Sequence, residues 1–115
     1  MIDNEGKWFF IETKDEAKIG YISHCLARKQ HEIGYGVIPG ERGKGYCTEA
    51  VTMMVDYLFL LKDIVRIQAD ADSQNMASRR VLEKAGFEKE GVLRKQYFVR
   101  GEWRDFILYS IMREE

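Results

Sequence analysis

The spacing of hydrophobic and polar positions divides the chain into six segments typical of strands and two typical of helices. The strand segments are rich in aromatic and β-branched residues or alternate apolar with polar positions. The longer helical segment confines its polar residues to one narrow stripe, which indicates a helix that is covered on most sides. The predicted strands are Trp8–Thr13, Lys18–Ala27, Glu32–Ile38, Val65–Ala71, Gly91–Val99 and Trp103–Met112, and the predicted helices are Tyr46–Lys62 and Met76–Ala85.

This order of elements, β-β-β-α-β-α-β-β, predicts one mixed α/β domain that spans residues 1–115. Short polar segments separate the first three strands, so we expect an antiparallel meander. The last two strands flank Arg100-Gly101-Glu102 and should form a hairpin. Gly86 follows the second helix and suits the left-handed residue that closes many helices. Gly34 and Gly36 interrupt the third strand, which indicates a bulge or the close approach of a ligand.

Charge and composition exclude several classes of partner. The net charge is −1, so no bulk field attracts the chain to nucleic acid or to an anionic membrane. Cys25, Cys47 and the two histidines lack the spacing of metal ligands, so no metal is expected. The longest apolar stretch is interrupted by Asp56 and is too short to cross a bilayer. Met1–Glu5 is acidic, unlike a signal peptide, and a cytoplasmic location is therefore expected.

A glycine-dense segment, Pro39–Gly45, lies between the third strand and the long helix. The first amides of a helix lack intrahelical partners and carry partial positive charge, and glycines let them approach phosphate oxygens. Arg42 and Lys44 add formal charge, so the segment indicates a pyrophosphate site; a solvent-exposed glycine turn explains the pattern equally well. The spacing fits neither a P-loop nor a dinucleotide fingerprint, because Ile38 and Thr48 stand where those motifs need small residues.

Several separated motifs resemble the GNAT superfamily of N-acetyltransferases. Arg42–Cys47 matches its pyrophosphate motif Q/R-x-x-G-x-G/A, except that a cysteine occupies the final small position. Asn75–Phe87 is similar to its N-x-x-S…E-K-x-G-F segment. The resemblance covers nearly the whole chain from Trp8 onward and implies the GNAT acetyltransferase core, an α/β fold with a mixed, mostly antiparallel sheet. Three C-terminal motifs are similar to the branch of the ribosomal-protein alanine N-acetyltransferases: Glu90–Arg94, Gly101–Asp105 and Tyr109–Ser110.

The resemblance implies acetyl-CoA as cosubstrate, bound where the third and fourth strands separate. Backbone amides of the glycine segment would hold its pyrophosphate, and the pantetheine arm would pair with the third strand as an added strand does. A backbone N–H near Val37 would polarise the thioester carbonyl; plain core packing is the alternative for this residue. Asn75 would bind the pantetheine or a loop, act as a helix N-cap, or do both. The implied cofactor-binding residues are Tyr35, Val37, Ile38, Arg42, Gly43, Lys44, Gly45, Tyr46, Cys47 and Asn75.

Acetyl transfer to an amine needs a base for the amine and a proton for the leaving thiolate. Glu32 opens the predicted third strand, where the histone-acetyltransferase branch places a glutamate base; an exposed strand-end carboxylate is the favoured alternative. Leu82 replaces the usual tyrosine acid of the second helix and cannot donate a proton. Ser78, one turn earlier, could donate through water, although such a serine more often caps or packs. His24 and His31 are expected to be structural.

The implied function is transfer of an acetyl group from acetyl-CoA to a primary amine, with a protein N-terminus as the first expected acceptor. Polyamines, aminoglycosides and amino acids remain open. A non-catalytic acyl-CoA-binding or interaction module is the alternative, because the family's N-terminal strand and two helices, which help to form the acceptor groove, have no counterpart here. A natural short form, a fragment, or a second chain that supplies the missing wall would each explain this departure.

The departure also bears on self-association. Without those elements the first strand becomes an open edge that carries Trp8, Phe9, Phe10 and Ile11. Natural proteins rarely leave such an apolar edge bare. A two-fold homodimer, or an exchange of strands between chains, would bury it, so we expect the partners of this chain to be acetyl-CoA, an amine acceptor and a second copy.

Overall fold

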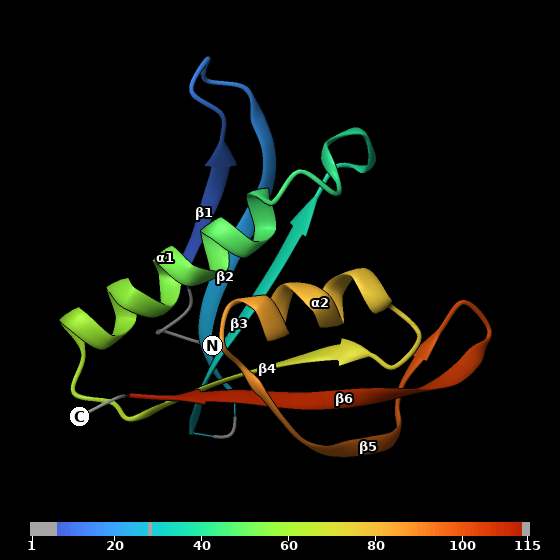
Figure 1. Cartoon of the computed structure of the whole chain (residues 1–115). Helices are drawn as coiled ribbons and strands as arrows, with labels where there is room; N and C mark the ends of the chain where they lie inside the picture. Colours follow the sequence, from blue (N-terminus) through green and yellow to red (C-terminus); the bar gives the residue numbers. More distant parts are fainter. Residues whose placement is uncertain (1–6, 28, 114–115) are drawn as a thin grey trace.

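A computed structural model describes residues 7–27 and 29–113, so the acidic segment Met1–Glu5 lies outside the described residues. One sheet and two helices form the molecule in the predicted order (Figure 1). A short 3₁₀ helix, Pro39–Glu41, follows the third strand. The strands are β1 (Lys7–Glu12), β2 (Lys18–Ala27), β3 (Gln30–Val37), β4 (Arg66–Asp72), β5 (Glu88–Val99) and β6 (Glu102–Met112), and the helices are α1 (Tyr46–Leu61) and α2 (Met76–Lys84).

The six strands form one mixed, mostly antiparallel sheet in the order β1-β2-β3-β4-β6-β5. The predicted meander β1–β2–β3 and the predicted β5–β6 hairpin are both antiparallel. The β3–β4 pair is parallel, and its register contains one bridge pair among the described residues, Glu32 opposite Gln68. Beyond this pair the two strands diverge (Figure 1), so the sheet opens toward their C-terminal ends.

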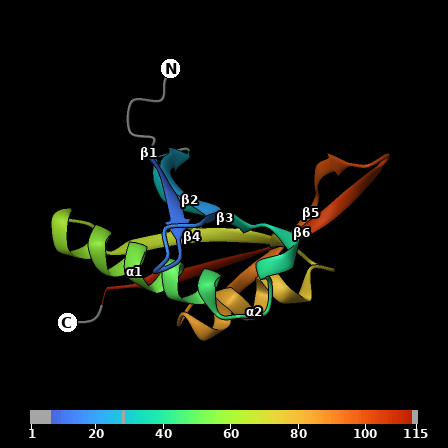
Figure 2. The ribbon, with the colours of Figure 1, turned by 90° about the horizontal axis from the view of Figure 1, so that it is seen from above.

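Both helices lie on the same side of the sheet (Figure 2). On β4 the residues Ile67, Ala69 and Ala71 are buried, whereas the alternate positions are only partly covered. Successive strand residues point to opposite faces, so the polar residues of β4 lie on the face away from the helices, which we call the open face. The core on the helix side also contains Ile11, Ile19, Ile22, Ile33, Val51, Met54, Val55, Leu58, Leu82, Phe87, Ile107 and Tyr109.

The two ends of α2 follow the residue types expected there. At the N-terminus, Asn75 Oδ1 accepts a hydrogen bond from the Ser78 N–H at 3.1 Å, which is an N-cap. At the C-terminus, Gly86 has a φ of 98°. Its N–H and that of Phe87 donate to carbonyls in the last turn, which is the Schellman arrangement. The predicted left-handed closure is confirmed. Within the described part of the chain, neither helix has the length and apolarity needed to cross a membrane.

Two strand starts differ from the prediction. β3 begins at Gln30, because its antiparallel ladder with β2 continues to the pair Ala27–Gln30. Glu32 therefore lies inside the strand and is half-buried, so the interpretation as an exposed strand-end carboxylate is wrong. β5 begins at Glu88, because its pairing with β6 extends to Ser110. Every other predicted boundary agrees within one residue.

The glycines of β3 make room for side chains of β2. A Cβ atom on Gly36 would lie 2.7 Å from the ring of Tyr21, and one on Gly34 would lie 3.2 Å from the hydroxyl oxygen of Ser23. The β2–β3 register has no bulge. The close approach expected at these positions is thus made by the neighbouring strand, and a larger residue at Gly36 would push against an aromatic ring.

Candidate functional site

A pocket of about 420 Å³ lies where α1 and α2 begin, beside the C-terminal end of β3. Ser78 lines it, together with eight of the ten residues implied to bind the cofactor: Tyr35, Val37, Arg42, Gly43, Gly45, Tyr46, Cys47 and Asn75. Ile38 and Lys44 lie outside the lining. The Ile38 side chain is half exposed, and the Lys44 ammonium lies 3.4 Å from the carboxylate of Glu41.

The glycine segment presents backbone amides to this pocket. Gly43 and Gly45 have φ values of 80° and 83°, in the left-handed region that glycine adopts without strain. Gly45 is the N-cap of α1 and has no side chain to cap it, so the amides of residues 46–48 have no intrahelical acceptor. A Cβ atom on either glycine would meet nothing within 4 Å, which leaves this backbone open to a ligand. Such an arrangement can bind a phosphate.

On the side that faces the pocket, the C-terminal end of β3 can form backbone hydrogen bonds with a ligand. The Ile38 N–H donates to the Ile19 carbonyl of β2 at 2.8 Å, and antiparallel pairs alternate between bonded and non-bonded. Val37, opposite Gly20, therefore directs its N–H away from β2. On that side β3 has already separated from β4. The geometry agrees with a Val37 N–H that meets a ligand carbonyl.

Two hydroxyl groups meet on the pocket wall. The Tyr35 hydroxyl lies 2.8 Å from Ser78 Oγ and donates to the Ser78 carbonyl at 3.1 Å. Burial raises the pKa of Tyr35 to about 12, so this phenol stays protonated near neutral pH. Burial likewise raises the pKa of the Cys47 thiol. Leu82 is fully buried in the core and takes no part in this pair.

The basic side chains of α2 lie in two different places. Arg80 and Lys84 line the pocket. Arg79 instead donates to the Tyr109 hydroxyl at 3.2 Å and to the Ser73 carbonyl at 3.1 Å. Among the described residues that line the pocket, the cations are those of Arg42, Arg80 and Lys84.

Two carboxylates lie on the open face, next to the point where β3 and β4 diverge. Glu32 Oε1 accepts a hydrogen bond from the Gln68 amide at 3.0 Å. Asp70 follows two positions later on β4, on the same face. Burial, and secondly the negative charge of Glu32, raise the pKa of Asp70 to about 6. Neither carboxylate lines the pocket, but both lie next to the point where β3 and β4 diverge, and a carboxylate with a raised pKa at such a point is a candidate base.

Asp70 is the functional candidate that the sequence analysis missed. The alternation of its strand marked it only as a polar position. Its neighbour Glu32 comes from another strand, and only the β3–β4 pairing brings the two together. The available signal was that two parallel neighbouring strands each carry a carboxylate near the place where they separate.

The histidines form a structural pair. His24 is buried, its Nε2 lies 3.0 Å from Nδ1 of His31, and the two rings are stacked with centroids 5.2 Å apart. In residues 7–27 and 29–113, no group of three or more His, Cys, Asp or Glu side chains is arranged to hold a metal ion.

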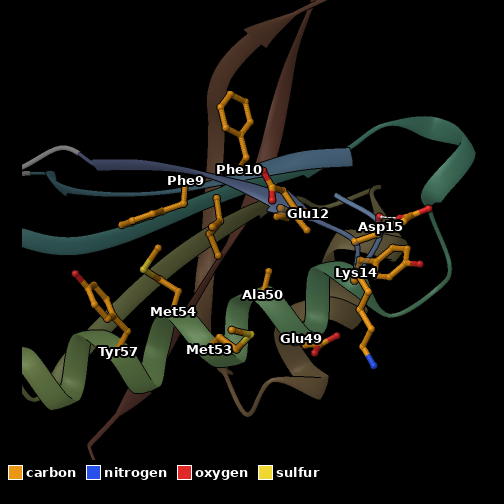
Figure 3. A pocket seen from close by; sticks show the side chains of 14 residues that line it. Phe9, Phe10, Glu12, Lys14, Asp15, Glu49, Ala50, Met53, Met54 and Tyr57 are labelled. Carbon is orange, nitrogen blue, oxygen red and sulfur yellow. Dashed lines mark hydrogen bonds between the residues drawn. The ribbon is translucent and has the colours of Figure 1, made fainter. Parts of the chain in front are cut away.

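A second, larger hollow of about 920 Å³ lies between β1 and α1. We call it the β1–α1 groove; Figure 3 shows Ala50 and Met54 directed from the helix toward β1, and Phe10 directed away from the helix. Of the predicted site residues it contains Tyr46 alone. Its lining includes the apolar side chains of Phe9, Ile11, Ala50, Met53, Met54 and Tyr57.

Residues 2–88 match the family model for the acetyltransferase (GNAT) domain. The chain belongs to the GNAT family. This GNAT chain is 43% identical over 98% of its length to a probable N-acetyltransferase, YjcK, of Bacillus subtilis and covers 65% of that protein. It thus spans less than two thirds of this curated relative.

Two solved structures confirm the predicted fold class. A ribosomal-protein-S5-alanine acetyltransferase from Vibrio fischeri superimposes with a TM-score of 0.87 at 29% identity, over 97% of this chain and 64% of that one. RimJ of Mycobacterium smegmatis, solved in complex with CoA-disulfide, has a TM-score of 0.86 at 32% identity, over 94% of this chain and 53% of that one. The resemblance to GNAT proteins is therefore confirmed.

Proposed function

We propose that this GNAT chain transfers an acetyl group from acetyl-CoA to a primary amine. The observation that carries the proposal is the pocket, which brings eight of the ten expected cofactor residues together. Its volume of about 420 Å³ is in the usual range for a small-molecule site. Open helix amides and the cations of Arg42, Arg80 and Lys84 suit the phosphates, and the free edge of β3 suits the amides of the pantetheine arm.

The reaction is proposed to take place where β3 and β4 diverge. The amine nitrogen attacks the acetyl carbon, a C–N bond forms, the C–S bond breaks, and the thiolate leaves. The Val37 N–H would stabilise the negative charge that develops on the carbonyl oxygen. Asp70 would take the proton from the amine, because its raised pKa makes it a stronger base than an ordinary carboxylate. Glu32, the base expected from the resemblance, is the alternative.

For the leaving thiolate, we propose Ser78 as the proton donor. Ser78 lines the pocket, and Leu82, at the position of the usual tyrosine, has no proton to give. The protonated Tyr35 hydroxyl lies 2.8 Å from Ser78 Oγ, so it can return a proton to the serine. The two hydroxyls would then act as one short relay.

The acceptor is proposed to be a protein N-terminus, with polyamines, aminoglycosides and amino acids as the other amines to test. Thiol release from acetyl-CoA, measured with the purified chain against one member of each class, tests the proposal. We expect release that depends on an alanine-terminated peptide. Binding of acetyl-CoA without release toward any amine would instead support the non-catalytic acyl-CoA-binding or interaction module.

We further propose that a second copy of the chain covers the β1–α1 groove. Trp8 and Phe10 on β1 are 71% and 68% exposed, and Leu60 on α1 is 85% exposed; Ile11, expected at this edge, is instead buried. β1 and α1 lie at the same side of the molecule (Figure 2). The exposed parts of seven apolar side chains amount to roughly 800 Å², about what each partner of a standard interface buries. They are Trp8 and Phe10, on the face of β1 that points away from α1, and Phe9, Met53, Tyr57, Leu60 and Leu61 on the other face of β1 and on α1.

Sedimentation at micromolar concentration should therefore show a dimer, formed by antiparallel pairing of β1 with its symmetry mate. Met53→Glu should weaken the dimer by at least about tenfold in Kd, because Met53 lines the β1–α1 groove and is exposed, so the substitution places a charge inside the interface. Phe98→Glu is the matched control, since Phe98 is 61% exposed on the distant β5–β6 hairpin. A monomeric wild-type chain, or equal effects of both variants, would contradict the proposal.

A further inference from the structure

A chain of hydrogen bonds crosses the open face and ends at Glu32. Gln68 Nε2 donates to Glu32 Oε1 at 3.0 Å, and Arg66 Nη2 donates to Gln68 Oε1 at 2.9 Å. Arg66 Nη1 is paired with Glu90 at 2.5 Å, and Glu90 also accepts a hydrogen bond from the Ser110 hydroxyl. Four strands thus contribute to one connected network.

The direction of the Gln68 amide follows from the chemistry of Arg66. A guanidinium has donors and no acceptor, so the amide oxygen of Gln68 must face it. The amide nitrogen then faces Glu32, where it donates to the carboxylate. Because Arg66 is itself held by Glu90 and by Gln30, whose Oε1 accepts from Arg66 Nε at 3.2 Å, the amide has one orientation available.

We propose that Gln68 is a positioning residue that, oriented by Arg66, holds the Glu32 carboxylate as a fixed negative charge beside Asp70. This would make Gln68 a control on how readily Asp70 takes up a proton. The effect of Gln68 on catalysis rests on the proposed function, in which Asp70 is the base. The effect of Gln68 on the position of the Glu32 charge can be measured without any turnover.

Of the charged groups near Asp70, Glu32 is the one that raises the pKa of Asp70. Tyr35 has its pKa raised by burial and stays neutral. Asp72 is paired with Arg104 at 3.1 Å, so the two charges largely cancel. Glu32 and Tyr35 of β3 interact electrostatically with Asp70, and Asp72, two positions later on the same face of β4, is neutralised by Arg104 of β6.

The test is a double-mutant cycle in the full chain, read out as the pKa of the Asp70 carboxyl carbon by NMR titration. Glu32→Gln should lower the pKa of Asp70 by about one unit, because it removes a like charge. In the Gln68→Met background the same Glu32→Gln change should have less than about half that effect, since Glu32 is then no longer held in place. The cycle cancels any direct effect of methionine on the solvation of Asp70.

Gln30→Met is the matched control. Gln30 also accepts from Arg66, and the described residues show no hydrogen bond between Gln30 and Glu32. Glu90 still holds Arg66 in Gln30→Met, so the full effect of Glu32→Gln should remain in that background. Gln68→Asn, which shortens the side chain and keeps its polarity, replaces Gln68→Met if the latter does not fold. An equal effect of Glu32→Gln in every background would overturn the positioning role of Gln68, and no effect at all would overturn the role of Glu32.

The pH dependence of kcat/KM separates this inference from the proposed function. If Asp70 is the base, the acidic limb of the profile should move with the NMR value in each variant. The NMR titrations could show the expected dependence on Gln68 while the pKa of the acidic limb stays the same in every variant. Asp70 is then not the base, and the positioning of Glu32 by Gln68 stands.

Discussion

Replacing Asp70 by asparagine should lower kcat by about 100-fold or more at neutral pH, because asparagine cannot take the proton from the amine. The pKa of about 6 means that wild-type activity is present above that pH and is lost as the pH falls through it. The variant should lose this acidic limb as well as the rate. Steady-state thiol release with the accepted amine, between pH 5 and pH 9, is the measurement.

Glu32→Gln is the comparison for this experiment. It removes a neighbouring charge and leaves the proposed base, so its effect on kcat at neutral pH should be much smaller than that of Asp70→Asn. A larger loss in Glu32→Gln, about 100-fold or more, with little loss in Asp70→Asn, would return the role of base to Glu32, as the family resemblance implied. Cofactor affinity should change little in either variant.

Unfolding cannot account for the loss expected in Asp70→Asn. The pKa of Asp70 is raised in the folded chain, so the folded state binds this proton more tightly than the unfolded state does. The stability that the proton contributes is present below the unfolded pKa and is lost as the pH rises through about 6. At pH 8 the buried charge therefore destabilises the wild type, and Asp70→Asn should melt at the same temperature or higher.

Acetyl-CoA should raise the melting temperature of the wild type, and Gly45→Val should abolish this shift. A ligand present at about 100 times its Kd stabilises the folded state by about 2.7 kcal/mol, which raises the melting temperature of a domain of this size by about ten degrees. Gly45 has a φ of 83°, and the space around its missing Cβ is open. Valine would distort the loop and place its side chain where the phosphates approach.

Gly101→Val provides a matched control for this experiment. Gly101 has a φ of 85° and an equally open Cβ position, but it lies in the β5–β6 turn, far from the pocket. Both variants should melt lower than the wild type because valine is strained at positive φ. Gly101→Val should keep the full shift with acetyl-CoA. A shift retained in Gly45→Val would remove the glycine segment from the phosphate site.

The helices and strands could be predicted because the period of apolar positions is a local property. The alternation of Ile67, Ala69 and Ala71 on β4, and the narrow polar stripe of α1, are both visible in the chain. The residue at which a strand begins, by contrast, depends on pairing with residues that are distant in the sequence. The start of β3 depends on how far its ladder with β2 extends, so the surroundings of Glu32 could not be read from its neighbours in the chain.

The candidate site was predictable to the extent that it is continuous in the sequence. Arg42–Cys47 is one continuous segment, a loop followed by the first two residues of α1, so its glycines and cations were recognisable together. The carboxylate pair combines Glu32 and Asp70 from two strands, and its electrostatics arise only when the chain folds. That Lys44 lies outside the pocket lining, with its ammonium 3.4 Å from the carboxylate of the lining residue Glu41, likewise becomes visible only in the folded chain.

The single bridge pair between β3 and β4 has a consequence for how the molecule opens. In the described residues, Glu32 and Gln68 form the one backbone bridge between two three-stranded halves, β1–β2–β3 and β4–β6–β5. Side-chain hydrogen bonds such as Tyr35–Ser78 and Arg66–Gln30, and the contact between α1 and α2, also connect them. Each half has the size of a cooperative unit that can unfold by itself. A molecule bound along the free edge of β3 would lie between the two halves as a seventh strand and make them unfold as one cooperative unit.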